Sequence, residues 1–115
     1  MKDIRDRTFN FAVRIVKICR HLEDVSKTAN IICKQLLRSG TSIGANVEEA
    51  QAGQSKADFI SKMTIALKES RETLYWLKLL EASELVSTKQ IENIQNENEE
   101  IAKIIASIII STKNN

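Results

Sequence analysis

Hydrophobic residues recur along this chain at alternating steps of three and four, the spacing that gathers them on one face of an α-helix. The pattern predicts four helices, at about residues 3–22, 27–52, 56–82 and 88–112. Ser26, Ser55 and Ser87 directly precede the last three of them, where a serine side chain caps the first turn. Four such helices with short connections predict an all-α fold, an up-down-up-down antiparallel four-helix bundle, in a single domain over residues 1–115.

Gly40 and Gly44 fall inside the second helix, and two interpretations are open. A glycine after Arg38 would end the helix, with Thr41 or Ser42 capping a new one. The apolar register argues against a break, because it continues without a slip through both glycines. Its members are Ala29, Cys33, Leu36, Gly40, Ile43, Val47 and Ala50. Interior glycines cost about 1 kcal/mol each relative to alanine, so we expect both to let a neighbouring helix approach closely. A kinked or broken helix is the alternative.

A few residues depart from this simple pattern. Ile65, Trp76 and Leu79 lie near the face of the third helix opposite its apolar stripe, and Ile110 lies on the charged side of the fourth. A tryptophan has little reason to face water in a monomeric bundle, so these four residues are candidates for an oligomer interface. Single exposed apolar residues are also normal, which is the alternative. Asn98 falls inside the stripe of the fourth helix, where it either fixes helix register or lies at the edge. The first helix carries a second apolar flank, formed by Phe9, Val13 and Val16.

The composition suits a helical protein and excludes other classes. The chain has 115 residues, three glycines and no proline. No apolar run approaches the roughly 20 residues that span a membrane, and the charged N-terminus lacks a signal segment. We therefore expect a cytoplasmic protein without membrane contact. Cys19 and Cys33 fall on apolar helix faces, which favours buried free thiols over a disulfide.

The residue pattern contains no catalytic or metal-binding constellation. Two cysteines and one histidine are too few for an ordinary four-ligand zinc site. No Glu stands three residues before His21, which excludes a di-iron bundle. We therefore expect no catalytic residues, metal, cofactor or small-molecule substrate. One enzymatic alternative stays open, because Arg14 and His21 have the spacing of the Arg-x(4–6)-His motif of HEPN-type ribonucleases. There an arginine would stabilise phosphate charge and a histidine would move a proton.

Charge is distributed unevenly along the chain. The net charge is +2, but residues 1–56 carry +4 and residues 57–115 carry −2. The excess falls mainly on the first helix, and rows of basic residues bind phosphates by releasing counterions. The candidate nucleic-acid-binding residues are Arg7, Arg14, Lys17, Arg20 and Arg38. No aromatic residues interleave with them, so sequence-specific readout is not expected. A solvated polar face is the alternative.

Two distinctive phrases, RSGTSIGAN and KESRETLYWL, lie within the segment from Gln35 to Leu80, and the first helix contains IRDRTFNFAVRIV. These stretches closely resemble the four-helix-bundle family of 23S ribosomal RNA intervening-sequence proteins, and the resemblance covers nearly the whole chain. It implies an up-down bundle that forms a homopentameric ring, as in the related accessory protein of diversity-generating retroelements, which binds nucleic acid and a reverse transcriptase. A ring would account for outward Ile65, Trp76 and Leu79. The family offers no catalytic residues to carry over.

Together, charge and resemblance predict a non-enzymatic homo-oligomer that binds RNA or a nucleoprotein partner through a basic surface including the first helix. Two alternatives remain. A ring of this kind could be a protein–protein interaction scaffold that never touches nucleic acid. The bundle could instead be the HEPN-like ribonuclease described above.

Overall fold

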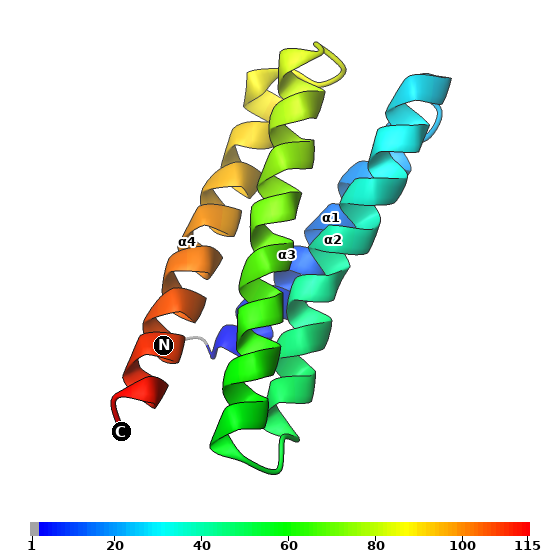
Figure 1. Ribbon diagram of the computed structural model, residues 1–115. Coiled ribbons are helices and arrows are strands. Elements are labelled where there is room, and N and C mark those ends of the chain that lie inside the picture. The colour runs from blue at the N-terminus through cyan, green and yellow to red at the C-terminus, as the bar shows by residue number, and fades with distance from the viewer. Residues whose placement is uncertain (1–2) are drawn as a thin grey trace.

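The computed structural model describes residues 3–115, which form four helices joined by short turns (Figure 1). They are α1 (Ile4–Leu22), α2 (Lys27–Gln51), α3 (Lys56–Ala82) and α4 (Thr88–Lys113). Each boundary lies within one residue of the position that the hydrophobic pattern predicts. Successive helices run in opposite directions, which confirms the all-α, up-down-up-down bundle. The bundle measures 47 × 21 × 21 Å. Within residues 3–115, no helix combines the length and the apolar character that crossing a bilayer requires.

Serine side chains cap three of the helices, as predicted. Ser26 and Ser55 each accept a hydrogen bond, at 3.0 Å, from the backbone N–H three residues ahead. Ser87 and Gln90 form a complete capping box at the start of α4. The Ser87 hydroxyl accepts from the Gln90 N–H at 3.2 Å, and Oε1 of Gln90 accepts from the Ser87 N–H at 2.8 Å. Because first-turn N–H groups have no partner within their own helix, these bonds fix where each helix begins.

The second helix runs unbroken through both of its glycines, which confirms the continuous α2. Gly40 and Gly44 are buried where α1 crosses closest. A Cβ added to Gly40 would lie 2.8 Å from Cγ1 of Ile15, and one added to Gly44 would lie 3.2 Å from the backbone oxygen of Thr8. Both distances are shorter than ordinary van der Waals contact. The absence of a Cβ at these two positions is therefore what lets α1 and α2 pack at this separation.

Two pairs of polar side chains meet inside the apolar core. Oγ of Ser70 donates to Oδ1 of Asn98 at 2.8 Å, and Nδ2 of Asn98 donates to the backbone oxygen of Ser70 at 3.1 Å. The hydroxyls of Ser39 and Thr73 lie 2.9 Å apart between α2 and α3. Asn98 is only 1 % exposed, which places it inside the core and not at its edge. Buried polar groups that find partners in this way fix the register of neighbouring helices.

The prediction that Trp76 and Leu79 face outward is wrong in part, because both are half-buried. Trp76 packs against the core, and its indole N–H donates to the Glu72 carboxylate at 3.0 Å. The reason is that α3 lies between α2 and α4 and buries both flanks beside its central stripe (Figure 1). Ile65 and Ile110 do face outward, with exposed fractions of 37 % and 61 %.

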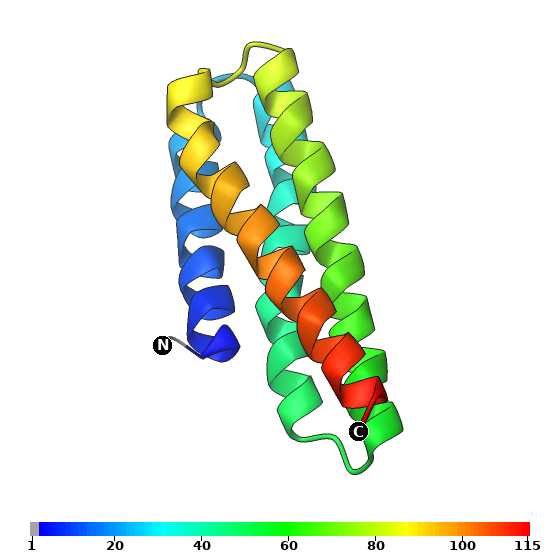
Figure 2. The ribbon, with the colours of Figure 1, turned by 90° about the vertical axis from the view of Figure 1, so that its left-hand side faces the viewer.

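The seam between α1 and α4 is the loosest of the bundle. The helices pack in cyclic order, most extensively between α2 and α3 and least between α1 and α4. Seen from the side, α4 crosses the bundle obliquely (Figure 2). Its first turns lie beside the C-terminal half of α1, and its last turns lie beside α3. The divergence leaves a groove along this seam.

Candidate nucleic-acid interface

The five predicted basic residues do not form one surface. Arg7, Arg14 and Lys17 lie on the flank of α1 that faces α4. Arg20 lies on the other flank, in a hollow that α2 also lines, and Arg38 lies against α3. Helical geometry explains the division, because the six residues from Arg14 to Arg20 rotate the side chain by about 120° around the helix axis.

Arg7 is paired with Glu97 of α4 by two hydrogen bonds. Nη2 of Arg7 lies 2.7 Å from Oε1 of Glu97, and Nε lies 3.2 Å from Oε2. These bonds raise the pKa of the Arg7 guanidinium above its ordinary value. Because the Glu97 carboxylate neutralises this guanidinium, Arg7 adds little to the attraction of a phosphate. Its role in this structure is to hold the N-terminal half of α1 against α4.

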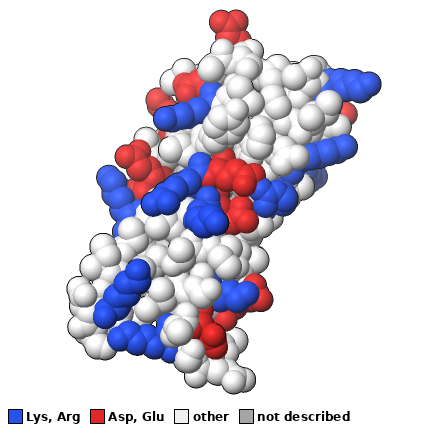
Figure 3. Space-filling view, in the orientation of Figure 1, with Lys and Arg blue, Asp and Glu red and all other residues white. Residues whose placement is uncertain are grey.

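Arg38 does not join the basic residues of α1, although α1 and α2 are neighbours as expected. Its guanidinium contacts two carboxylates of α3, with Nη1 3.4 Å from Glu69 and Nη2 bonded to Glu72. The indole N–H of Trp76 and the Arg38 guanidinium together lower the pKa of the Glu72 carboxyl. On this face, over α2, α3 and α4, acidic and basic side chains are interspersed (Figure 3). It therefore presents no field of a single sign.

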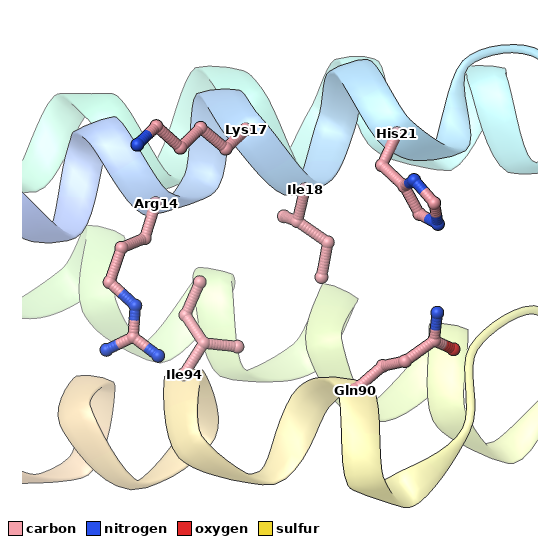
Figure 4. Close-up of a pocket in the computed structure, with 6 residues that line it drawn as sticks. All are labelled: Arg14, Lys17, Ile18, His21, Gln90 and Ile94. Carbon is pink, nitrogen blue, oxygen red and sulfur yellow. The ribbon is translucent and has the colours of Figure 1, made fainter.

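An open groove of about 390 Å³ lies between α1 and α4 (Figure 4). It is lined by Arg14, Lys17, Ile18, His21, Gln90 and Ile94. Ile18 and Ile94 supply its apolar surface, and Ile94 is buried. The Arg14 and His21 side chains extend from α1 toward α4, while Lys17 follows the outer surface of α1. The Gln90 amide extends from α4 toward His21.

Among residues 3–115, no carboxylate pairs with Arg14 or Lys17 of this groove. Arg14 and Lys17 are exposed, and neither forms an ion pair in the part of the chain that the structure describes, residues 3–115. Unpaired cations beside a low-dielectric apolar surface retain their attraction for an anion. The arrangement can hold a phosphate at the rim and an apolar ring against the isoleucines.

Three residues that line the groove, Ile18, Gln90 and Ile94, were not predicted as site residues from the sequence. The available signal was the topology. In an up-down-up-down bundle the fourth helix begins at the end where the first helix stops, so the first turns of α4 must lie near Lys17 and His21. Nothing in the local sequence around Gln90 marks it, apart from its place in the capping box.

The other flank of α1 exposes apolar side chains. Phe9 is 67 % exposed, Val16 is 38 % exposed and Leu37 of α2 is 39 % exposed. Two hollows of about 250 and 260 Å³ follow the line between the two helices, the first containing Phe9 and the second Val16 and Leu37. We refer to these three residues as the α1–α2 apolar face. Contiguous exposed apolar patches larger than a few hundred Å² are typical of protein-binding surfaces, whereas single exposed apolar residues are normal.

The two cysteines are buried and free, as predicted. Sγ of Cys19 lies 3.5 Å from the backbone oxygen of Cys33. Hydrogen bonding to Cys33, together with burial, raises the pKa of the Cys19 thiol. A thiol that stays protonated is a poor nucleophile. Within residues 3–115, no three or more His, Cys, Asp or Glu side chains cluster in a way that would hold a metal ion.

Fold and groove together define a small antiparallel helical bundle with a basic groove along its loosest seam. The family described as 23S rRNA-intervening sequence protein matches residues 2–107, and this chain belongs to that family. A solved structure from Bacteroides thetaiotaomicron VPI-5482, of a protein with unknown function from the S23 ribosomal protein family, is similar, with a TM-score of 0.87 and 48 % sequence identity. The similarity covers 93 % of this chain and 98 % of that one. No curated protein matches the sequence.

Proposed function

We propose that this protein is a non-enzymatic, cytoplasmic homo-oligomer that binds RNA through the groove between α1 and α4. The observation that carries the proposal is that Arg14 and Lys17, which form no ion pair within residues 3–115, lie beside an apolar surface. Phosphate binding at such cations releases counterions and gives most of the affinity for a nucleic acid. The family description, which refers to 23S rRNA, supports RNA as the ligand.

Assembly is part of the proposal, and a homopentameric ring is the form that the family resemblance implies. One groove with two free cations is a modest site, and several linked copies would bind a long RNA far more tightly. A ring uses two different faces of each subunit. We propose the α1–α2 apolar face as one of them and the surface around Ile65 and Ile110 as the other. Trp76 and Leu79, half-buried, would border this second contact.

The mass in solution tests the assembly. We expect light scattering to give close to five times the 13.0 kDa of one chain. Phe9→Glu should lower that mass, because it puts a charge into the α1–α2 apolar face. Val25→Glu is the matched control, since Val25 is 53 % exposed in the turn between α1 and α2 and should leave the mass unchanged. A monomeric mass for the unmodified protein would contradict the ring.

Affinity for a fluorescent single-stranded RNA, measured between about 50 and 200 mM salt, tests the binding site. Arg14→Ala/Lys17→Ala should weaken binding by about tenfold and reduce the slope of log affinity against log salt by about 2. Lys68→Ala/Lys78→Ala removes the same charge from exposed positions of α3 and should change both quantities much less. An affinity that does not fall as the salt concentration rises would contradict the proposal. So would an equal loss of affinity in the two double variants relative to the unmodified protein.

The two competing functions predict different results with the same reagents. An interaction scaffold would retain protein partners after nuclease treatment and would bind no RNA. A ribonuclease is worth testing because Arg14 and His21 line the same groove. It would shorten the RNA, and His21→Ala would leave the RNA intact. RNA that stays intact with the unmodified protein supports the non-enzymatic function.

A further inference from the structure

We infer that the groove binds one unpaired nucleotide of an RNA strand whose base, uracil or guanine, presents a carbonyl oxygen to the amide of Gln90. The inference rests on the RNA binding proposed above and adds which strands and bases are preferred. It depends on the capping box at the start of α4, whose Gln90 also lines the groove.

The shape of the groove favours a single nucleotide. Its volume of about 390 Å³ falls in the range of small-molecule sites, and it is open to solvent. Ile18 and Ile94 offer apolar contact to the face of a base, and Arg14 stands beside them for the adjoining phosphate (Figure 4). A base inside a duplex has its faces stacked and its pairing edge occupied, so only an unpaired base reaches this surface. Single-stranded RNA is therefore the preferred form.

The orientation of the Gln90 amide is set by its second role. Its Oε1 accepts the backbone N–H of Ser87 at 2.8 Å, and only an oxygen can accept that bond. The same bond turns the NH₂ group of the amide into the groove, where Figure 4 shows the nitrogen directed toward His21. The groove thus presents a hydrogen-bond donor whose direction the capping box favours before any ligand binds, which reduces the side-chain entropy lost on binding.

The four bases differ in the group that would meet this donor. With the phosphate at Arg14, at the other end of the groove from Gln90 (Figure 4), a base group remote from the sugar meets this donor, at position 4 of a pyrimidine or position 6 of a purine. At that position uracil and guanine carry a carbonyl oxygen, and cytosine and adenine carry an amino group. The side-chain N–H of Gln90 donates a hydrogen bond to the carbonyl oxygen. It forms no hydrogen bond with an amino group, because both groups are donors. A single neutral hydrogen bond gives a preference of about threefold to tenfold. Such a preference needs no stacking aromatic residue, and the basic flank of α1 carries none.

Oligouridylate and oligocytidylate strands of about ten nucleotides test the inference, because they have equal length and charge. The unmodified protein should bind the uridylate about threefold to tenfold more tightly. Gln90→Glu should reverse this ratio. A glutamate preserves the capping box, in which it is a usual partner of serine, but it replaces the donor in the groove with an acceptor for the cytosine amino group. Each ratio is measured within one variant, so a change in overall charge cancels.

A duplex of the uridylate strand with oligoadenylate should bind more weakly than the single strand at the same salt concentration. Equal affinity for uridylate and cytidylate, an unchanged ratio in Gln90→Glu, or equal affinity for the duplex would each overturn the inference. If RNA binding still weakens with salt in those cases, the proposed function stands. Loss of affinity for every RNA tested removes both.

Discussion

Replacing Gly40 by valine should lower the free energy of unfolding by about 3 kcal/mol, measured by urea denaturation. A Cβ at this position would lie 2.8 and 2.9 Å from Cγ1 and Cγ2 of Ile15. Ile15 is fully buried, and its β-branched side chain has few alternative rotamers, so α1 must move to make room. The loss would occur even though valine is a slightly better helix former than glycine.

Two further variants separate this clash from helix propensity. Ala45→Val changes an exposed position of the same helix and should cost well under 1 kcal/mol. In an Ile15→Ala background the space beside Gly40 is empty. Adding Gly40→Val there should lower the free energy of unfolding by at least about 1 kcal/mol less than it does in the unmodified protein. Additive effects of the two substitutions would show that close packing is not the reason for the glycine.

Asn98→Asp should be similarly severe, with a loss of about 3–5 kcal/mol at neutral pH. The substitution preserves shape, but it buries a charge at a position that is 1 % exposed. It also removes the donor that Asn98 gives to the backbone oxygen of Ser70, leaving two oxygens facing each other. Because burial favours the protonated carboxyl, the folded state binds the proton more tightly than the unfolded chain. The loss should therefore shrink as the pH falls toward about 5.

Asn96→Asp is the matched control for this prediction. It makes the same chemical change at an exposed position of α4 and should alter the free energy of unfolding by no more than about 0.5 kcal/mol. Urea denaturation at two pH values measures both variants. Equal losses in the two variants, or a loss for Asn98→Asp that does not depend on pH, would contradict a buried and paired asparagine.

The sequence was sufficient to predict the helices and their order. The uninterrupted spacing of apolar residues predicted that the second helix continues past Gly40 and Gly44, and the serine caps predicted where three helices begin. The burial of Trp76 could not be predicted from the sequence, because periodicity describes one helix at a time. Both α2 and α3 pack closely against two neighbours, and only the assembled bundle reveals how far each flank is covered.

The candidate site was predictable only in part. Charge pattern identified Arg14 and Lys17, which the structure leaves unpaired within residues 3–115. It could not foresee that Arg7 and Arg38 are neutralised by carboxylates of other helices, because those contacts depend on how the helices cross. The predicted topology places the first turn of α4, and with it Gln90, at the end of the bundle where α1 stops. That the Gln90 side chain lines the groove depends on the oblique path of α4, which no short stretch of sequence encodes.

The order in which the helices pack has a kinetic consequence. Every closely packed pair, α1 with α2, α2 with α3 and α3 with α4, is joined directly by a short turn. Chains dominated by such local pairing fold within microseconds to milliseconds. Only the closing of α4 onto α1 brings together segments from opposite ends of the chain. We expect that step to come late in folding, so a nascent chain would acquire the groove between α1 and α4 only after the rest of the bundle has formed.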